Sequence, residues 1–314
     1  MKPIYSVVCN SLNTYSSNLT DSLTNGNFSS PVQTSGTFSS VTTLSGWTKT
    51  TTTYIINSYN DSFYSSTRGT LPTSVSSSQY LATQQTAIRT DYLTQSVNMA
   101  EGVYNISFYS ARRSKITVTT GYATTQTLSF SFNGTTYLNA NTYSTYDWLT
   151  SSYDVTVSQD GNYELKFTID NTVATDSSIL LGYVLITRYP CLLKYAIDWS
   201  FLPRNKKYKL SYVYRSASIS SAYLLLLSLP DLNVMNNNFE GGNDTSISST
   251  SVIGYISTDI FQTRFLSYYK DSLNVLCSGQ TNNIFRVKIT QTDGSYYANI
   301  QEYILTLHFE EIDD

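Results

Sequence analysis

The sequence predicts an all-β protein with two jelly-roll-like β-sandwich domains in tandem. Segments of strictly alternating apolar and polar residues recur, as in Gly102–Phe108, Gly161–Phe167, Tyr208–Tyr214 and Tyr303–Phe309. Such alternation gives a strand one buried and one wet face, which is typical of antiparallel sheets packed in pairs. The chain is rich in Tyr (28) and Phe (13) but only 13% charged, a composition that suits strands better than helices. No long stretch has helical spacing.

The length and one proline predict the domain boundaries. A chain of 314 residues corresponds to one large or two ordinary domains. Pro190 cannot donate to a strand ladder and therefore marks a boundary. We predict an arm over residues 1–21, a first sandwich over 22–189 and a second over 190–314. The Ser-, Asn- and Thr-rich arm is expected to pair with a neighbour or lie over a surface, and the alternative is a mobile terminus.

Strands are predicted wherever β-branched or alternating segments are bounded by turn residues. In the first sandwich a turn at Asn25-Gly26 precedes a strand that begins at Phe28, and Asn57–Pro72 is a long polar loop. Asn133-Gly134 and Asp160-Gly161 are predicted hairpin turns. The further strands predicted for the first sandwich are 50–56, 79–82, 92–97, 102–108, 116–118, 127–132, 154–157, 161–167 and 178–186. Those predicted for the second sandwich are 208–214, 223–229, 252–256, 273–276, 282–289 and 302–310.

Charge and composition exclude several classes of function. The net charge is −3, and no basic face is available for the phosphates of a nucleic acid. The first residues lack the apolar region of a signal peptide, and no run approaches the about 18 apolar residues of a membrane span. Cys9, Cys191 and Cys277 are odd in number and far apart, which favours buried free thiols over disulfides or a zinc site.

A set of phrases in the first sandwich supports a comparison with a known family. In order they are Asn25-Gly26-Asn27-Phe28 with Pro31, Gly46-Trp47, Gly102-x-Tyr104-x-Ile106-x-Phe108, Gly161-x-Tyr163-x-Leu165-x-Phe167 and Gly182-Tyr183-Val184. They resemble the galactose-binding-like jelly rolls, a group that includes carbohydrate-binding modules and plant-wall domains. The resemblance covers residues 22–188 and implies the fold, and less specifically sugar binding. Ser29 stands where the family usually has Glu, a departure from its shared cation or ligand site.

The second sandwich carries phrases of another kind. They are Trp199-Ser200-Phe201, Tyr208-x-Leu210-x-Tyr212, Asn283-Ile284-Phe285-Arg286-Val287 and Tyr303-Ile304-Leu305-Thr306-Leu307-His308-Phe309-Glu310-Glu311. They resemble a β-sandwich found in virion-associated proteins of large DNA viruses, virophages and polinton-like viruses, including minor capsid and penton proteins.

The sequence offers few residues suited to catalysis. His308 is the only histidine, and its phase in the last strand directs it toward water or an interface, so a Ser-His or Cys-His device is disfavoured. A glycosidase pair of carboxylates is not visible, and no Gly-rich phosphate loop precedes a helix. We expect no enzyme activity and no cofactor.

Metal binding is also not expected, although oxygen ligands for calcium are conceivable in turns. The candidates are Asn27, Asp170 and Asn171 in the first sandwich, and Asn243 and Asp244 in the second. Plain turn residues are the preferred interpretation.

Sugar binding would use aromatic side chains in loops, which stack on pyranose rings. The candidate glycan-binding residues are Tyr59, Phe63, Tyr64, Tyr143, Tyr146 and Trp148. Trp47 is assigned to the core instead. The alternative for the loop tyrosines is packing on the edge of the sandwich or against another subunit.

Two functions follow as expectations. The viral resemblance implies a non-enzymatic virion structural protein, namely a minor capsid, penton or vertex- or surface-associated component. Such a protein would assemble inside the host cell with itself, as a trimer or pentamer, and with the major capsid protein. The alternative is a carbohydrate-binding surface protein that recognises host glycans through the loop aromatics, and an outer domain could combine the two.

Overall fold

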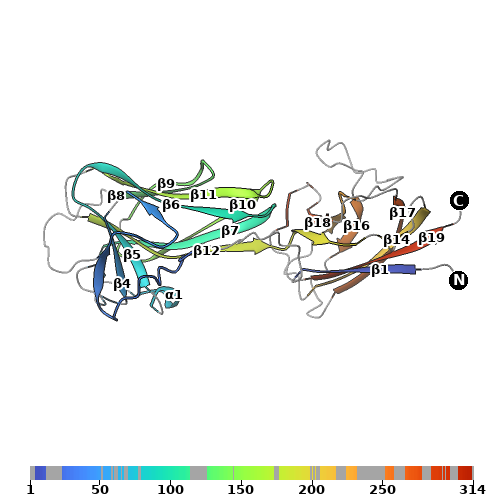
Figure 1. Ribbon diagram of the computed structural model, residues 1–314, viewed down its shortest axis with the longest axis horizontal. Helices are drawn as coiled ribbons and strands as arrows, with labels where there is room; N and C mark the ends of the chain where they lie inside the picture. Colours follow the sequence, from blue (N-terminus) through green and yellow to red (C-terminus); the bar gives the residue numbers. More distant parts are fainter. Residues whose placement is uncertain are drawn as a thin grey trace. The chain divides into compact units, whose positions relative to one another are not determined.

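The computed structural model describes most of the two sandwiches. The described residues are 4–11, 23–50, 52–57, 59, 63–64, 66, 70–76, 79–113, 126–143, 145–172, 177–198, 200, 202, 206–216, 224–231, 252–257, 266–277, 284–291, 293, 295–297 and 303–312. Their regular secondary structure is almost entirely β-strand, with one short helix, α1 (Thr73–Ser76). Figure 1 shows the strands gathered into two bodies. The all-β, β-sandwich architecture predicted from the sequence is confirmed.

The two sandwiches are not two consecutive segments of the chain. One unit, the N-terminal sandwich, comprises Leu19–Ala100 and Tyr104–Thr187. The other, the C-terminal sandwich, comprises Met1–Asn18, Glu101–Val103 and Arg188–Asp314. The first strand of the chain therefore belongs to the second sandwich instead of forming a separate arm.

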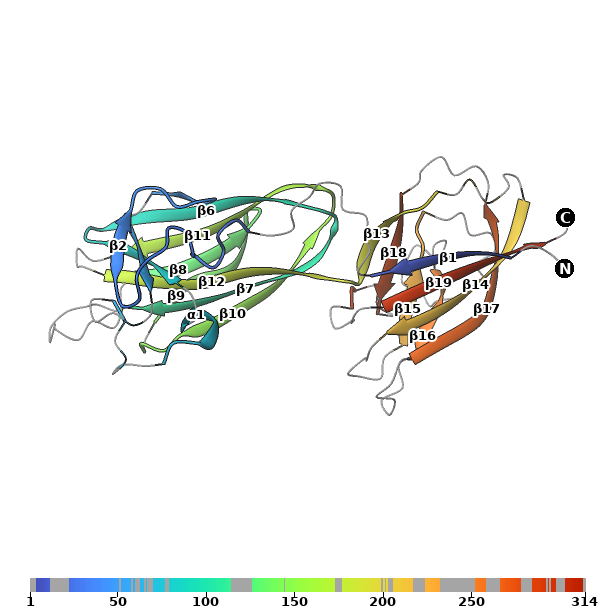
Figure 2. The same ribbon diagram turned by 60° about the horizontal axis from the view of Figure 1, so that its bottom comes forward.

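The N-terminal sandwich is built of two antiparallel sheets. The six-stranded sheet has the order β10 (Leu149–Val157), β7 (Gly102–Arg112), β12 (Ser177–Tyr189), β5 (Gln79–Gln85), β4 (Thr52–Asn57) and β2 (Phe38–Val41). The five-stranded sheet has the order β3 (Thr48–Lys49), β6 (Arg89–Met99), β11 (Gly161–Asn171), β8 (Gln126–Phe132) and β9 (Thr135–Thr142). Figure 2 shows the sheets from a second direction.

Alternating side chains fill the space between these two sheets. Phe108, Phe130 and Phe167 meet there, with ring centroids 5.0–5.3 Å apart. Trp47 is buried as predicted, with its ring 6.1 Å from that of Phe167. Asn105 lies on the opposite, partly exposed face of β7. The period-2 pattern thus assigned the core face of these strands correctly.

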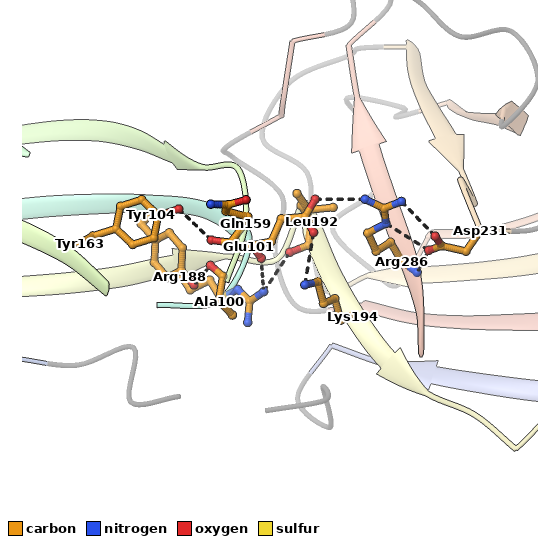
Figure 3. A network of polar contacts seen from close by, with 10 residues as sticks. All are labelled: Ala100, Glu101, Tyr104, Gln159, Tyr163, Arg188, Leu192, Lys194, Asp231 and Arg286. Carbon is orange, nitrogen blue, oxygen red and sulfur yellow. Dashed lines mark hydrogen bonds and ion pairs between the residues drawn. The ribbon is translucent and has the colours of Figure 1, made fainter. Parts of the chain in front are cut away.

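The recurring Gly-x-Tyr phrase has a local explanation (Figure 3). The hydroxyl of Tyr104 donates to the carbonyl oxygen of Ala100 at 2.8 Å, and that of Tyr163 donates to the carbonyl oxygen of Gln159 at 2.8 Å. In both phrases the tyrosine binds a carbonyl four residues earlier, in the turn that leads into the strand. Each ring is buried while its hydroxyl keeps a partner, as buried tyrosines require.

The two predicted hairpin turns have different outcomes. Asn133 (φ 47°) and Gly134 (φ 80°) join β8 to β9, and two successive positive φ values are those of a type I′ hairpin. The turn at Asp160-Gly161 is not a hairpin, because it joins β10 to β11, which lie in different sheets. An Asp-Gly pair marks a turn, but it does not specify which strands pair.

The C-terminal sandwich has two four-stranded sheets. One has the order β1 (Ile4–Asn10), β19 (Tyr303–Ile312), β14 (Lys206–Ser216) and β17 (Leu266–Cys277). The other has the order β13 (Leu192–Ala196), β18 (Ile284–Thr290), β15 (Leu224–Ser228) and β16 (Val252–Ser257). Both views place β1, in dark blue, beside β19, in red. Val7 faces Leu307 across this antiparallel pair.

The core of the C-terminal sandwich is as rich in aromatic side chains as that of the N-terminal sandwich. Tyr208, Leu210, Tyr212 and Tyr214 of β14 all point inward and are fully buried. Leu225 to Leu227 form a buried strand, as predicted.

Cys9 and Cys191 are buried free thiols, and burial raises the pKa of Cys9 to about 12. The side chain of Cys277, the predicted strand 116–118, and Trp199 and Phe201 of the viral-type phrase lie outside the described residues.

Candidate functional site

Four of the six predicted glycan-binding residues lie in one aromatic cluster. Tyr59, Phe63, Tyr64 and Trp148 pack on the outer face of the six-stranded sheet, next to α1. Tyr59 stacks on Tyr64 at 6.3 Å, and Tyr64 contacts Trp148 at 5.7 Å between ring centroids. The hydroxyl of Tyr59 accepts a hydrogen bond from the backbone N–H of Leu71 at 2.9 Å. The described aromatic residues of the segment predicted to be a long polar loop, Tyr59, Phe63 and Tyr64, therefore pack onto the sheet.

Burial takes most of this aromatic surface out of reach of a ligand. Phe63 and Tyr64 are 2% and 0% exposed. Burial, and then the negative charge of Asp147, raise the pKa of Tyr64 to about 12, so its hydroxyl stays protonated. Tyr59 and Trp148 are half-buried. A ring that stacks on a sugar needs an open face, which Phe63 and Tyr64 do not offer here.

The other two predicted residues lie elsewhere in the same sandwich. Tyr143 is buried, and its hydroxyl donates to Ser110 Oγ at 2.7 Å. Burial raises the pKa of Tyr143. The ring of Tyr146 lies under the guanidinium of Arg112, 4.1 Å from its carbon atom. A part for these six residues in sugar binding stays a prediction.

A different feature of the N-terminal sandwich offers an open site. A hollow of about 510 Å³ lies along the edge strand β2 and the loops that flank it. We call it the Ser/Thr pocket. Its lining residues are Ser30, Pro31, Gln33, Ser39, Ser40, Val41, Thr42, Thr43, Leu44 and Ser45. Six of these ten are Ser or Thr, and none is charged or aromatic. Val41 and Leu44 point into the core, which leaves the hydroxyl groups at the surface.

A tight turn closes one end of the Ser/Thr pocket. The backbone N–H of Trp47 donates to the carbonyl oxygen of Leu44 at 3.0 Å. Gly46 within this turn has φ +78°, and a Cβ there would come within 2.6 Å of Thr24 Cβ. Only glycine fits this backbone, and the buried Trp47 then anchors the turn to the core.

The amide side chains of Asn25 and Gln79 hold the backbone at the other end of the Ser/Thr pocket. Asn25 accepts a hydrogen bond from Ser30 N at 3.0 Å and donates to Ser30 O at 2.8 Å. Gln79 is 4% exposed, and its Nε2 donates to Phe28 O at 2.7 Å and to Pro31 O at 2.8 Å. Its Oε1 accepts from Gln33 N. The segment from 25 to 33 has no regular structure, so the prediction of a strand beginning at Phe28 is wrong, and these side chains fix the path of the segment.

The sequence prediction missed the Ser/Thr pocket for a physical reason. Serine and threonine occur on any wet sheet face, so their type carries no site signal. The available signal was a Ser/Thr-rich run between two anchors, Pro31 before it and Trp47 after it. The chemistry is that of neutral hydrogen bonding, because the lining has no titratable side chain.

A charged network in the C-terminal sandwich is structural in character (Figure 3). Glu101 pairs with Lys194 at 3.3 Å and with Arg286 at 3.3 Å. Arg286 also binds both oxygens of Asp231, at 2.9 and 3.1 Å. This pairing raises the pKa of Arg286. Arg188 donates to the carbonyl oxygen of Glu101 at 2.7 Å. The charges of Glu101 and Asp231 offset those of Lys194 and Arg286, which is typical of a structural network.

The remaining predicted candidates have ordinary surroundings. His308 Nδ1 lies 2.8 Å from Ser6 Oγ on the neighbouring strand β1. Asn27 caps the backbone N–H of Ser29 at 3.2 Å, and Asp170 accepts from Thr90 Oγ1. Asn243 and Asp244 lie outside the described residues.

Two features are absent from the described part of the chain. It contains no group of three His, Cys, Asp or Glu placed to hold a metal. It also has no helix with the length and apolarity needed to cross a membrane.

The comparisons with known proteins show no family for this chain. No protein-family model matches it, and no curated protein does. Among solved structures, TmCBM61 in complex with β-1,4-galactotriose is similar at 9% identity and TM-score 0.34, over 46% of this chain and 89% of that one. The CBM22-1–CBM22-2 tandem domain of Paenibacillus barcinonensis Xyn10C is similar at 11% identity and TM-score 0.28, over 90% and 100%.

A third similar structure comes from a phage. The enzymatically active domain of Bacteriophage CBA120 tailspike protein 4 matches at 14% identity and TM-score 0.31, over 46% of this chain and 19% of that one. Two of the three structures are thus carbohydrate-binding modules, and none is a capsid or penton protein. Scores this low carry no argument about this chain.

Proposed function

We propose that this chain is a non-enzymatic glycan-binding protein whose Ser/Thr pocket takes an uncharged saccharide. One observation carries the proposal, namely a hollow of about 510 Å³ whose lining of six Ser or Thr residues, one Gln and three apolar residues carries no charge. Its volume lies within the range of about 300–1,000 Å³ that small-molecule sites occupy.

The chemistry of the lining suits sugar hydroxyl groups. A sugar hydroxyl both donates and accepts hydrogen bonds, and so do the hydroxyls of Ser40, Thr42 and Thr43. A charged ligand would lose water in this pocket without gaining a counter-charge, which is costly. A purely apolar ligand would leave the exposed hydroxyls unpaired.

The pocket is also held in shape before a ligand arrives. Asn25 and Gln79 fix the path of residues 28–33 by side-chain bonds to the backbone. Sites that are ordered in advance lose less conformational entropy on binding. The pocket therefore does not depend on the loop aromatics, although Tyr59 and Trp148 in the aromatic cluster and Tyr146 elsewhere in the sandwich are only partly buried.

The capsid role predicted from the C-terminal phrases stays a prediction. Trp199 and Phe201, which carry part of that resemblance, lie outside the described residues. Self-association as a trimer or pentamer, binding to a major capsid protein and assembly inside a host cell are likewise predictions, and the mass of the purified chain in solution tests the first of them.

A glycan array followed by titration calorimetry tests the proposed function. We expect binding of at least one neutral oligosaccharide to the full chain. Thr43→Val removes one pocket hydroxyl and should weaken binding by roughly 2- to 12-fold, the equivalent of one net hydrogen bond. Thr48→Val is the matched control, because Thr48 is exposed on β3 outside the pocket lining.

Two results would contradict the proposal. One is the absence of binding to any neutral glycan. The other is binding that Thr43→Val leaves unchanged but Tyr146→Ala abolishes, which would return the site to the loop aromatics.

A further inference from the structure

A layer of polar side chains closes one end of the core of the N-terminal sandwich. Gln85 from β5, Asp91 from β6, Gln126 from β8 and Asn171 from β11 are each no more than 5% exposed. We call them the polar end layer. Across the ladder, Asn171 lies directly opposite Gln126. One row deeper in the core, Ile169 of β11 lies opposite Asp91.

Hydrogen bonds in the polar end layer run in a fixed direction that Asp91 sets. Gln85 Nε2 donates to Asp91 Oδ2 at 2.8 Å, and Gln126 Nε2 donates to Gln85 Oε1 at 2.8 Å. A carboxylate only accepts, so Gln85 must turn its NH₂ group toward Asp91 and its oxygen toward Gln126. Gln126 must then turn its own oxygen away from Gln85. Asn171 is oriented separately, because its Nδ2 donates to Ala87 O at 3.1 Å.

This ordering leaves two buried oxygens without hydrogen-bond partners. They are Gln126 Oε1 and Asn171 Oδ1. Turning either amide over would bring oxygen against oxygen, at Gln85 Oε1 in one case and at Ala87 O in the other. The two residues face each other on adjacent strands, where Cβ atoms are typically about 4.5–5.5 Å apart. Two lone acceptors so close together in a buried place call for a hydrogen-bond donor or a cation between them.

We propose that Asp91, Gln126 and Asn171 bind a hard metal cation through oxygen atoms. Asp91 supplies the negative charge, and the two amides supply neutral oxygen ligands. Backbone carbonyls or water would complete the six to eight positions that calcium takes. The set contains no imidazole or thiolate, so zinc and copper are not favoured. Calcium, magnesium and sodium share the required chemistry.

Arg89 is the group with which the cation competes. Its Nε lies 2.6 Å from Asp91 Oδ2, and its side chain is 42% exposed, so it can swing into solvent. Of the three calcium candidates predicted from the sequence in this sandwich, only Asn171 belongs to the site, because Asp170 points out of the core toward Thr90 and Asn27 caps the backbone N–H of Ser29.

Thermal melting of the full chain tests the proposal. The protein is stripped with a chelator and then melted in Ca²⁺, Mg²⁺ or Na⁺ at constant ionic strength. A cation that binds only the folded state at 100 times its Kd should raise Tm by roughly 5–10 °C for a domain of this size. Calorimetric titration of the stripped wild type should give one site per chain. If none of the three cations raises Tm or gives heat, the proposal is wrong.

Three variants separate a metal from a buried water molecule. Asn171→Asp adds a charged ligand and should tighten binding by about tenfold or more. If water fills the site, the same variant places two carboxylates together, lowers Tm and is not rescued by any cation, and the proposal is overturned. Asn171→Leu should abolish the Tm shift. Asp170→Asn, one residue away but facing outward, should preserve it, and loss of the shift in Asp170→Asn would also overturn the proposal. Should Asn171→Leu fail to fold, the wild-type titration and the Asn171→Asp variant still decide between a bound metal and a buried water molecule.

Discussion

Replacing Gln79 by methionine is expected to loosen the Ser/Thr pocket and to destabilise the N-terminal sandwich. Methionine has a similar length and packs well in apolar surroundings. It would nevertheless remove the donor that Gln79 gives to Phe28 O and Pro31 O, and the acceptor that it gives to Gln33 N.

The magnitude follows from the burial of the three bonds. The bond to Phe28 O is buried, and loss of its donor should cost about 1–3 kcal/mol. The bonds to Pro31 O and Gln33 N are partly buried, and each should cost about 0.5–1.5 kcal/mol. The free energy of unfolding should fall by about 4 kcal/mol, equivalent to a drop in Tm of roughly 8–16 °C for a domain of this size.

Calorimetry, hydrogen exchange and glycan titration together form the assay. Gln95→Met is the matched control, because Gln95 is also buried and makes two bonds to the backbone of Thr24 at 2.7 and 2.9 Å. Both variants should lower Tm, but only Gln79→Met should speed the exchange of the Gln33 amide and weaken glycan binding. A Gln79→Met protein with unchanged Gln33 exchange and a stability loss below about 0.5 kcal/mol would refute this reasoning.

Three further predictions concern packing, thiol chemistry and backbone shape. Changing Phe130 to Ala should lower the free energy of unfolding by about 3–5 kcal/mol, as measured by urea unfolding, because its ring lies within 6.3 Å of four other aromatic rings. A loss under about 1 kcal/mol would contradict the assignment of Phe130 to the core. The thiol of Cys9, with its pKa raised from 9.0 to about 12, should not react with a thiol reagent at about pH 8 until the protein unfolds. Its contribution to stability is complete below pH 9.0 and should be lost as the pH rises toward about 12, because the unfolded state releases the proton first. Gly46→Ala should lower Tm more than Gly134→Ala, since both have positive φ but only Gly46 has an atom 2.6 Å from the added Cβ; equal losses would remove the steric argument.

Local patterns in the sequence predicted the strands and their buried faces well. Leu165 and Phe167 are buried on one face of β11, whereas Glu164 is exposed on the other. The alternation works because a strand turns successive side chains to opposite faces whatever it pairs with. The Asn133-Gly134 hairpin was predictable for the same reason, since its backbone shape is a property of two residues.

Pairing between distant segments was not predictable from these patterns. Ser6 and His308 are in contact although 302 positions separate them in the sequence. No local property of either strand indicates that the two strands pair. The sequence also placed Phe63 and Tyr64 in an exposed loop, because polar neighbours surround them. Their burial depends on the outer face of a sheet to which residues such as Tyr80 and Leu180 contribute. The Ser/Thr pocket was missed because its walls consist of the commonest polar residues in the chain.

The pairing of β1 with β19 has a consequence for biosynthesis. The sheet that β1 and β19 share can form only after all the residues between them have been made, and it must close a loop that contains the whole N-terminal sandwich. That sandwich can complete its own core earlier, as an inserted domain. Until then the apolar side of β1, with Val7 and Cys9, has no cover and is a natural target for a chaperone. A fragment that starts at residue 188 would leave the edge of β19 open to pairing with other chains, and supplying residues 4–10 as a separate peptide should restore its solubility.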